Sequence, residues 1–300
     1  MSDNSKFQWI QPRDPGRVNW YGLWTLYKKE VQRFFKIFLQ TVAAPIATTI
    51  LFMAIFTLAL GNLRPDIRGV PFIEFLAPGL IMMSILQQAF NHTSSSLLIS
   101  KIQGNIVDIL MPPISAGEMN VAISLGGVTR GIVVALVSLP CIHFLFVELS
   151  IFHTWAIIYY SVSGSLFLSL LGIITGIWSE KFDHLGTITN FIIVPLSFLS
   201  GTFYSVDRMP EFARILIDYN PFFYIIDGFR YGFIGSSDSS IFFGVIFILI
   251  LNIFLWVLSL FLLKKGLIDQ NSISADDLSL IHISEPTRLL SISYAVFCLK

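Results

Sequence analysis

Six long apolar segments constrain this chain more than any other feature of its sequence. An α-helix needs about 20 apolar residues to cross the hydrocarbon core of a membrane, and each segment is close to or above that length. The segments are Phe38–Leu60, Phe72–Phe90, Asn120–Phe146, Thr154–Trp178, Thr187–Phe203 and Ser240–Leu263. We therefore predict an all-α integral membrane fold with six transmembrane helices.

The composition agrees with a membrane protein. Charged residues make up 13% of the 300 residues, whereas soluble domains carry about a quarter. The formal net charge is zero, so no basic surface indicates a nucleic-acid partner. Pro45, Pro78 and Pro195 lie inside predicted spans, where neighbouring helices can satisfy the carbonyls that proline frees.

Lysines and arginines flank the spans unevenly, and this predicts the orientation of the chain. Cytoplasmic segments next to spans carry an excess of these residues. The flanking cations are Lys28, Lys29, Arg33 and Lys36 before the first span, and Lys264 and Lys265 after the last. We expect both termini in the cytoplasm, which an even number of spans requires.

Two further segments have amphipathic patterns. Trp20–Phe38 mixes aromatic residues at helical spacing with cations, which predicts a helix lying in the headgroup region; the alternative is an extension of the first span. Asn91–Met119 is the longest predicted cytoplasmic connection, and its apolar residues recur every three to four positions up to Pro112. Such a helix can lie on lipid or dock into a partner's groove, and its periodicity does not choose between them.

Motifs for catalysis, nucleotide binding and metal binding are absent from the sequence. It has no phosphate-binding P-loop and no Cys/His cluster with metal-ligand spacing. His92, His143 and His153 are isolated, so we expect them to be polar interfacial residues. Arg130 falls near the predicted start of the third span, where we expect its side chain to reach the headgroups. The deep interiors of the spans are otherwise almost free of charge, which indicates that the energy for any transport comes from elsewhere.

Several sequence fragments together resemble the membrane permease subunits of ABC-2 type ABC transporters. The resemblance covers about Trp20 to Gly266. Its most specific fragments are APGLIMMSI (Ala77–Ile85), QGNIVDILMPPISAGEM (Gln103–Met119), GGVTRG (Gly126–Gly131), PLSFLSGTFYSVDRMPEF (Pro195–Phe212) and YNPFFYIIDGFRYGFIG (Tyr219–Gly235). Each fragment is weak alone, and the combination is specific.

The resemblance implies a half-transporter that exports cargo across a bacterial inner membrane. A permease dimer, expected to be a homodimer, would surround the pathway within membrane lipid. Separate ABC ATP-binding subunits would hold ATP and Mg²⁺, so this chain would bind no cofactor or metal and would not itself be an enzyme. The resemblance leaves the cargo open among drugs, lipids, polysaccharides and other amphiphiles.

The resemblance also assigns two functional segments. About Ser96–Met111 would be the cytoplasmic coupling helix that docks on the ATPase, and short helices between spans five and six would lie at the outer mouth. The coupling residues are Lys101, Ile102, Gln103, Asn105, Ile106, Asp108, Ile109 and Leu110. The outer-gate candidates are Gly201, Phe203, Tyr204, Pro210, Asn220, Pro221 and Arg230. For the second set, the alternative is an ordinary interfacial loop with aromatic anchors.

These interpretations divide the chain into three parts. Residues 1–37 form a cytoplasmic N-terminus with the interfacial helix, residues 38–266 form the six-span domain, and residues 267–300 form a tail. Leu278–Arg288 (LSLIHISEPTR) resembles a translated sequencing-library adaptor, so we expect residues 278–300 to be read-through. The alternative is a short amphipathic cytoplasmic tail.

Other function classes fit the sequence less well. A secondary carrier or channel usually needs charged groups at mid-membrane depth, and a membrane-embedded enzyme needs a cluster of catalytic side chains. A non-transporting scaffold would not need the amphipathic connection. The leading hypothesis is therefore an ATP-driven export permease, with a carrier, channel or scaffold as the alternatives.

Overall fold

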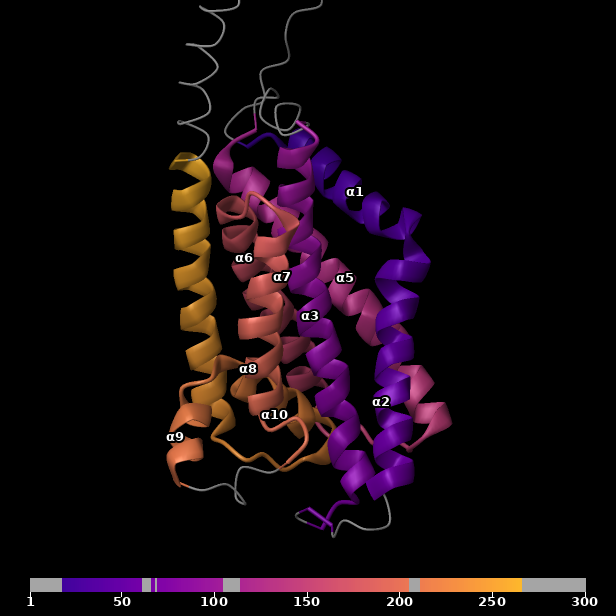
Figure 1. The fold of residues 1–300 in the computed structure, drawn as a ribbon. Helices are drawn as coiled ribbons and strands as arrows, with labels where there is room; N and C mark the ends of the chain where they lie inside the picture. The colour runs from indigo at the N-terminus through magenta and orange to yellow at the C-terminus, as the bar shows by residue number, and fades with distance from the viewer. Residues whose placement is uncertain (1–17, 61–65, 68, 105–113, 205–210, 266–300) are drawn as a thin grey trace, which may run out of the picture.

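The protein is a bundle of long helices that run roughly along one axis (Figure 1). The computed structural model describes residues 18–60, 66–67, 69–104, 114–204 and 211–265. Within these ranges, six helices are long and apolar enough to cross a membrane, which confirms the predicted all-α, six-span fold. The spans are Leu39–Ala59, Phe72–Ile102, Ala116–Leu145, Thr154–Trp178, Phe182–Leu199 and Ile241–Lys265.

The helices are labelled as in Figure 1. They are α1 (Trp20–Lys36), η1 (Leu39–Ala43), α2 (Ala44–Leu60), α3 (Phe72–Ile102), α5 (Ala116–Leu145), α6 (Thr154–Trp178), α7 (Phe182–Ile188), η2 (Thr189–Ile193), α8 (Val194–Leu199), α9 (Glu211–Asp218) and α10 (Pro221–Ile234). We call η1 with α2 span one, α7–η2–α8 span five, and Ile241–Lys265 the C-terminal span.

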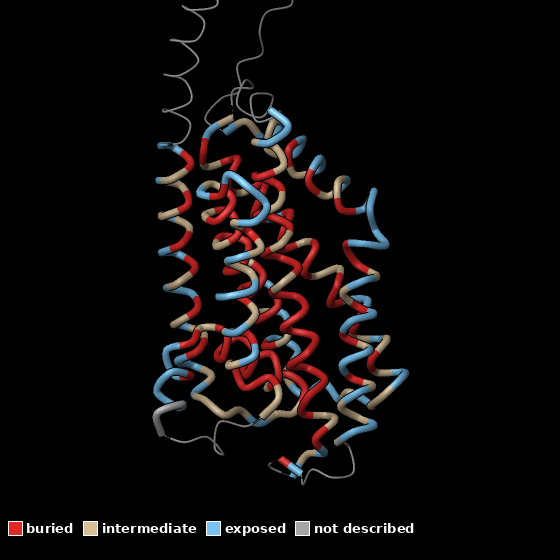
Figure 2. Tube along the Cα trace, viewed as in Figure 1, coloured by how far each residue is buried: buried red, intermediate tan, exposed pale blue. Residues whose placement is uncertain are grey.

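The core of the bundle is formed by α3, α5, α6 and α10. Most of α3 is buried, while span one, span five and the C-terminal span expose much of their surface (Figure 2). Glycines let α6 pack closely on its neighbours: a Cβ atom at Gly172 would lie 2.7 Å from the Phe90 carbonyl oxygen of α3. Small residues at such contacts are typical of helix packing in membranes.

Helix α3 is longer than the sequence predicted. It continues from Phe90 to Ile102, through residues that the sequence analysis assigned to a connection. At 1.5 Å per residue its 31 residues span about 46 Å, which exceeds the hydrocarbon core of about 30 Å. The polar residues after Phe90 end the apolar run in the sequence, but they do not end the helix.

Spans one and five each contain a π-helical turn. In span one the turn is η1, which begins three residues after the last residue of α1, and in span five η2 separates α7 from α8. A π-turn holds one more residue than an α-turn and commonly marks a functional position. Both predicted spans are present, and span five begins at Phe182, five residues before the predicted start.

Helix α1 docks on the bundle along one face. Glu118 of α5 accepts a hydrogen bond from the Asn19 backbone at 2.6 Å, and the Tyr27 and Thr129 hydroxyls lie 2.9 Å apart. On the other face Trp20 and Tyr21 are exposed. The predicted helix is confirmed, and its outward aromatic residues suit the headgroup position that we predict for it.

The two short helices expected between spans five and six are present as α9 and α10. Their position at the outer mouth stays a prediction, and α10 is buried within the chain: Phe222–Arg230 packs against α3 and α6. Asn220 caps the helix by accepting from the Phe222 backbone, and Gly235 ends it at a φ of +77°. Its 14 residues are too few to cross a membrane but enough to fill the core.

The start of α1 and the end of the C-terminal span lie at the same end of the bundle, which we call the α1 end; the opposite end is the α9 end (Figure 1). This agrees with an even number of spans, while the side of the membrane that each end faces stays a prediction. Residues 105–113 and 205–210 and the predicted read-through at 278–300 lie outside the described residues.

Candidate functional site

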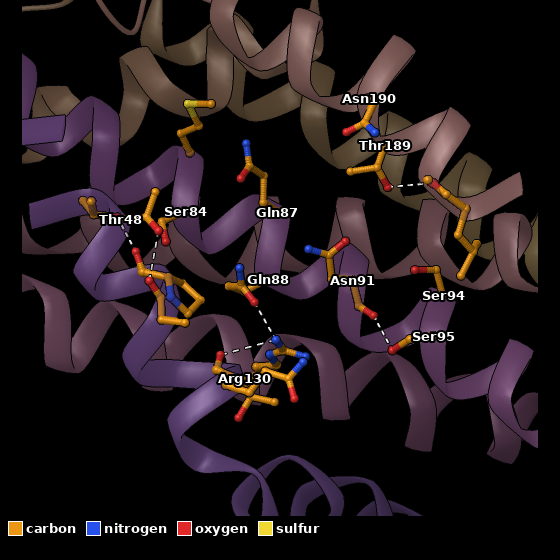
Figure 3. Close-up of a pocket in the computed structure, with 18 of the residues that line it drawn as sticks. Thr48, Ser84, Gln87, Gln88, Asn91, Ser94, Ser95, Arg130, Thr189 and Asn190 are labelled. Carbon is orange, nitrogen blue, oxygen red and sulfur yellow. Dashed lines mark hydrogen bonds between the residues drawn. The ribbon is translucent and has the colours of Figure 1, made fainter. Parts of the chain in front are cut away.

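A cavity of about 800 Å³ lies between span one, α3 and span five. Helix α3 forms its back wall, and α5 contributes Arg130 (Figure 3). The cavity touches α3 from Leu80 to Ile99, a distance of about 28 Å at 1.5 Å per residue. It therefore follows α3 for nearly the thickness of a hydrocarbon core.

The wall on α3 is a stripe of polar side chains, which we call the α3 polar stripe. Its members recur every three to four residues, so they share one helical face. They are Ser84, Gln87, Gln88, Asn91, Ser94 and Ser95. The Ser94 and Ser95 hydroxyls donate to the carbonyls of Phe90 and Asn91 one turn back. The amides of Gln87 and Asn91 remain as polar groups lining the cavity (Figure 3).

The facing walls are also polar, and they include both π-turns. Thr41 comes from η1, and Thr189 and Asn190 come from η2. The hydroxyls of the threonines bond within their own helices: Thr48 donates to Ala44 at 3.0 Å, and Thr189 to Leu185 at 2.8 Å. Asn190 is exposed in this isolated chain. An exposed amide inside a span needs water or a partner chain to satisfy it.

Arg130 is buried beside the cavity, at the middle of α5. Its side chain is 8% exposed, so the expectation that it reaches the headgroups is wrong. The guanidinium donates to the Gln88 side chain and, at 3.3 Å, to the Thr41 carbonyl (Figure 3). Arg130 thus joins α5 to α3 and η1. The α5 helix extends 14 residues before it and 15 after it, which leaves the side chain far from either helix end.

A second buried group of charges joins α1 to α3, and we call it the Glu30 cluster. The Glu30 carboxylate lies 3.2 Å from Arg33 and 3.3 Å from His92, and it accepts from the Ser96 hydroxyl at 2.7 Å. His92 is 1% exposed, so the expectation of an interfacial histidine is wrong there. Burial alone would raise the pKa of Glu30, but its hydrogen bonds and the Arg33 charge lower that pKa to about 2.

The other two histidines considered in the sequence analysis, His143 and His153, have local roles. His143 accepts a hydrogen bond from the Leu149 backbone at 3.0 Å, and His153 stacks on Tyr231 at 4.5 Å between ring centroids. His143 lies in the last turn of α5, and His153 is the N-cap residue of α6. Their positions suit the polar, non-catalytic role that the sequence analysis assigned to them.

The structure brings most of the outer-gate candidates together at the α9 end. Gly201 has a φ of +73°, and its carbonyl accepts from Arg230 at 2.8 Å. Arg230 also lies 3.7 Å over the Phe75 ring. Asn220 donates to the Leu196 carbonyl at 2.9 Å, at the start of the helix in which Pro221 is the first residue.

Phe203 and Tyr204 complete this group of gate candidates. Phe203 packs on Phe56 of span one and Phe198 of span five, with ring centroids 5.1 and 5.2 Å apart, and it also lines the cavity. The Tyr204 hydroxyl donates to the Leu199 carbonyl at 2.9 Å. Pro210 lies outside the described residues. The gate candidates therefore adjoin the cavity through Phe203.

The coupling residues are only partly described. Lys101 and Ile102 form the last turn of α3, and Gln103 caps it. The Lys101 ammonium bonds to the carbonyls of Ile177 and Ser179 at the end of α6, where a cation complements the helix dipole. Asn105, Ile106, Asp108, Ile109 and Leu110 lie outside the described residues, so the coupling helix stays a prediction.

Sequence reasoning missed the α3 polar stripe and the Glu30 cluster. The stripe had a visible signal, because Ser84 to Ser95 place polar residues at helical spacing in and after an apolar run. The Glu30 cluster had no visible signal in the sequence, because Glu30 and His92 are 62 residues apart and only the packing of α1 on α3 brings them together. Arg130 was noticed but placed wrongly, because the sequence does not say which helices surround it.

Comparison with known proteins gives consistent matches along most of the chain. Residues 21–234 match the family described as ABC-2 type transporter. The inner membrane transport permease YadH of Escherichia coli strain K12 is 34% identical over 251 residues, which cover 83% of this chain and 97% of that protein. Nodulation protein J of Rhizobium leguminosarum bv. viciae is 23% identical over 240 residues, covering 75% of this chain and 86% of that protein.

Proposed function

This chain belongs to the ABC-2 type transporter family and is a multi-pass transport permease of the inner membrane, and from that premise we propose that it carries the translocation pathway of an ATP-driven exporter. The cavity along α3 is the part of the pathway that one chain supplies. A separate ABC ATP-binding subunit drives the transport cycle, and a second permease chain completes the walls.

The length and polarity of the cavity carry this proposal. Its contact with α3 runs for about 28 Å, which is close to the thickness of the hydrocarbon core. Polar side chains line it along the α3 polar stripe and at Asn190. Lipid-facing surfaces of membrane helices avoid such groups, because lipid offers them no hydrogen-bond partners. A water-filled pathway or a partner chain offers hydrogen-bond partners to these polar groups.

Arg130 bears on the alternative of a secondary carrier. Its burial removes the argument that the spans hold no deep charge. An arginine keeps its proton in proteins, so it cannot relay protons as the carboxylates and histidines of proton-coupled carriers do. Arg130 therefore gives no support to a proton-coupled carrier, and we keep the ATPase subunit as the proposed energy source.

Water access to the cavity tests the proposal. In a background with Cys141 and Cys298 changed to serine, single cysteines replace Gln87, Asn91 and Asn190. A charged thiol reagent modifies only thiolates that water reaches. We expect labelling at these three positions in membrane vesicles and protection at the control positions Phe254 and Val257, which are exposed on the apolar C-terminal span.

The same variants test the energy source. The permease is co-expressed with the ATPase encoded beside its gene, and the purified complex is trapped with vanadate. We expect co-purification, vanadate-sensitive ATP hydrolysis and a changed labelling rate of the cysteine at position 91 on trapping.

Equal protection of the cavity and control positions would rule out an aqueous pathway here. A permease that folds well but binds no ATPase would favour the carrier or scaffold alternatives.

A further inference from the structure

Arg130 is a buried cation without an anionic partner in the described part of the chain. Its two described hydrogen bonds go to the neutral oxygens of Gln88 and Thr41. Two other arginines differ: the partly exposed Arg33 pairs with Glu30, and the buried Arg230 is attracted by Asp227 and Asp238. Arg33 repels Arg130 electrostatically, because both side chains are cations.

The Arg130 guanidinium also has an unused hydrogen-bond donor. An arginine has five N–H groups in a planar fork that matches the oxygens of a phosphate or carboxylate. The two described bonds leave from one terminal nitrogen, and Nε has no acceptor among the described residues. An unpaired charge in a membrane interior is costly, so such residues pair with one another or mark the path of a ligand.

The cavity beside Arg130 changes character along its length. Its described lining contains no aspartate, glutamate or lysine, so Arg130 is the source of formal charge there. Toward the α9 end the lining is apolar, with Leu80, Phe198 and Phe203. Gln88, which holds the guanidinium, lies eight residues along α3 from Leu80, a distance of about 12 Å. A cationic position and an apolar wall thus share one cavity.

We propose that Arg130 binds the anionic group of an amphiphilic cargo, with the apolar part of the cargo against the wall formed by Leu80, Phe198 and Phe203. This inference rests on the proposed pathway and adds to it a substrate class: a lipid-like molecule with a phosphate, sulfate or carboxylate group. The cargo supplies the negative charge that the described chain does not place beside Arg130. Gln88 and the Thr41 carbonyl hold the guanidinium in position for it.

The test measures lipid binding directly. The full chain is purified in neutral detergent, and native mass spectrometry gives the affinities of phosphatidylglycerol and phosphatidylcholine with identical acyl chains. One headgroup is anionic and the other zwitterionic, so the ratio of affinities reports recognition of charge. We expect phosphatidylglycerol to bind about tenfold or more tightly, as a charge-assisted hydrogen bond to a buried guanidinium allows.

Three variants separate recognition of the anion from a structural role of Arg130. Arg130→Gln removes the charge and should abolish the preference, while Arg130→Lys keeps the charge and should retain most of it. Gln88→Glu places a carboxylate at the side chain that already contacts Arg130, so it should abolish the preference with the arginine still present. This last variant remains informative if Arg130→Gln fails to fold.

Each outcome decides a part of the proposal. A preference that persists in Arg130→Gln or Gln88→Glu would overturn the assignment to Arg130. Inorganic phosphate that competes as strongly as the lipid would overturn the amphiphile and leave a site for a free anion. An Arg130-dependent preference in a chain whose cavity cysteines stay protected would support the anion site and reject the proposed pathway, so the two proposals can fail separately.

Discussion

Glu30 shows how strongly one buried residue can link two helices. Its carboxylate is on α1, while His92 and Ser96 are on α3, and Gly126 of α5 packs so closely that a Cβ atom there would lie 3.0 Å from Glu30. The negative charge is stabilised by a cation and by hydrogen bonds that are formed only in the folded chain. Removing one partner of such a group leaves the others buried and unpaired.

This arrangement predicts an acid-sensitive contribution to stability. The folded-state pKa of Glu30 is about 2 and its ordinary value is 4.5, so the contribution is complete above the ordinary value and is lost as the pH falls toward 2. We expect Glu30→Gln to lower the Tm at pH 7, with a difference from wild type that shrinks as the pH drops below about 4.5. Thermal unfolding in detergent from pH 7 to 3 measures this.

The matched control is Glu148→Gln, because Glu148 is exposed at the α9 end. It should leave the Tm unchanged across the range. An equal effect of both substitutions, or a Glu30→Gln difference that grows as the pH falls, would contradict the role of the cluster.

At the scale of helices, the contact between α3 and α6 depends on small residues. Gly172 of α6 faces Thr93 of α3 as well as the Phe90 carbonyl, and Gly131 of α5 leaves room for Ser165 of α6. Because backbone atoms of α3 form part of the contact at Gly172, an added methyl group there cannot be accommodated by rotating a side chain. These contacts therefore fix the distance between the core helices.

We expect Gly172→Ala to destabilise the protein by about 1–3 kcal/mol, the usual cost of overpacking a core. Gly186→Ala is the control, since nothing lies within 4 Å of a Cβ atom there, and it should be neutral or slightly stabilising because alanine favours the helix. Unfolding in mixed micelles with increasing denaturing detergent measures both. Equal stability of the two variants would show that α3 and α6 can move apart at little cost.

The sequence predicted helices well wherever hydropathy alone decides. The span Thr154–Trp178 was placed at the residues where α6 begins and ends, because a membrane-crossing helix must be apolar along its length. The prediction from sequence failed where tertiary contacts decide the length or the burial of a helix. The end of α3 carries polar residues that pack on α1 and line the cavity, and α10 is buried although it is too short to span.

The cavity residues also divide into those that the sequence could predict and those that depend on tertiary contacts. The polar stripe could have been found from its spacing on α3, whereas the burial of Arg130 depends on the position of η1 and Gln88 in space. The resemblance placed Gly201, Asn220 and Arg230 in one gate, and the structure brings them together at the α9 end. Their role in gating stays a prediction.

Across the whole molecule, α3 connects the cavity to the α1 end. The cavity follows α3 as far as Ile99, and three residues later the helix ends within the predicted coupling segment, which begins at about Ser96. Lys101 fastens that end to the carbonyls of α6. A displacement of the coupling segment by an ATPase subunit would therefore act on two core helices together.

This arrangement gives the prediction for coupling. We expect Ile106→Asp and Ile109→Asp to abolish cargo-stimulated ATP hydrolysis while the chain still inserts, because a charge disrupts docking of an apolar helical face. Ile151→Asp is the control, since Ile151 is exposed in the connection at the opposite end. Vanadate-sensitive hydrolysis in the reconstituted complex is the measurement. Full stimulation in the Ile106 and Ile109 variants would overturn the coupling assignment.

The π-turn in span five has a consequence for how this helix tolerates changes in length. A π-turn absorbs one surplus residue within a single turn, so Leu185 before it and Phe198 after it can both face the cavity. Deleting one residue from Thr189–Ile193 would convert the π-turn into an ordinary α-helical turn. Leu185 and Phe198 would then still face the cavity. The same deletion in α6, which is a regular α-helix, would rotate everything beyond it by about 100°. Span five can therefore change by one residue, at this turn alone, without turning its polar side chains toward lipid.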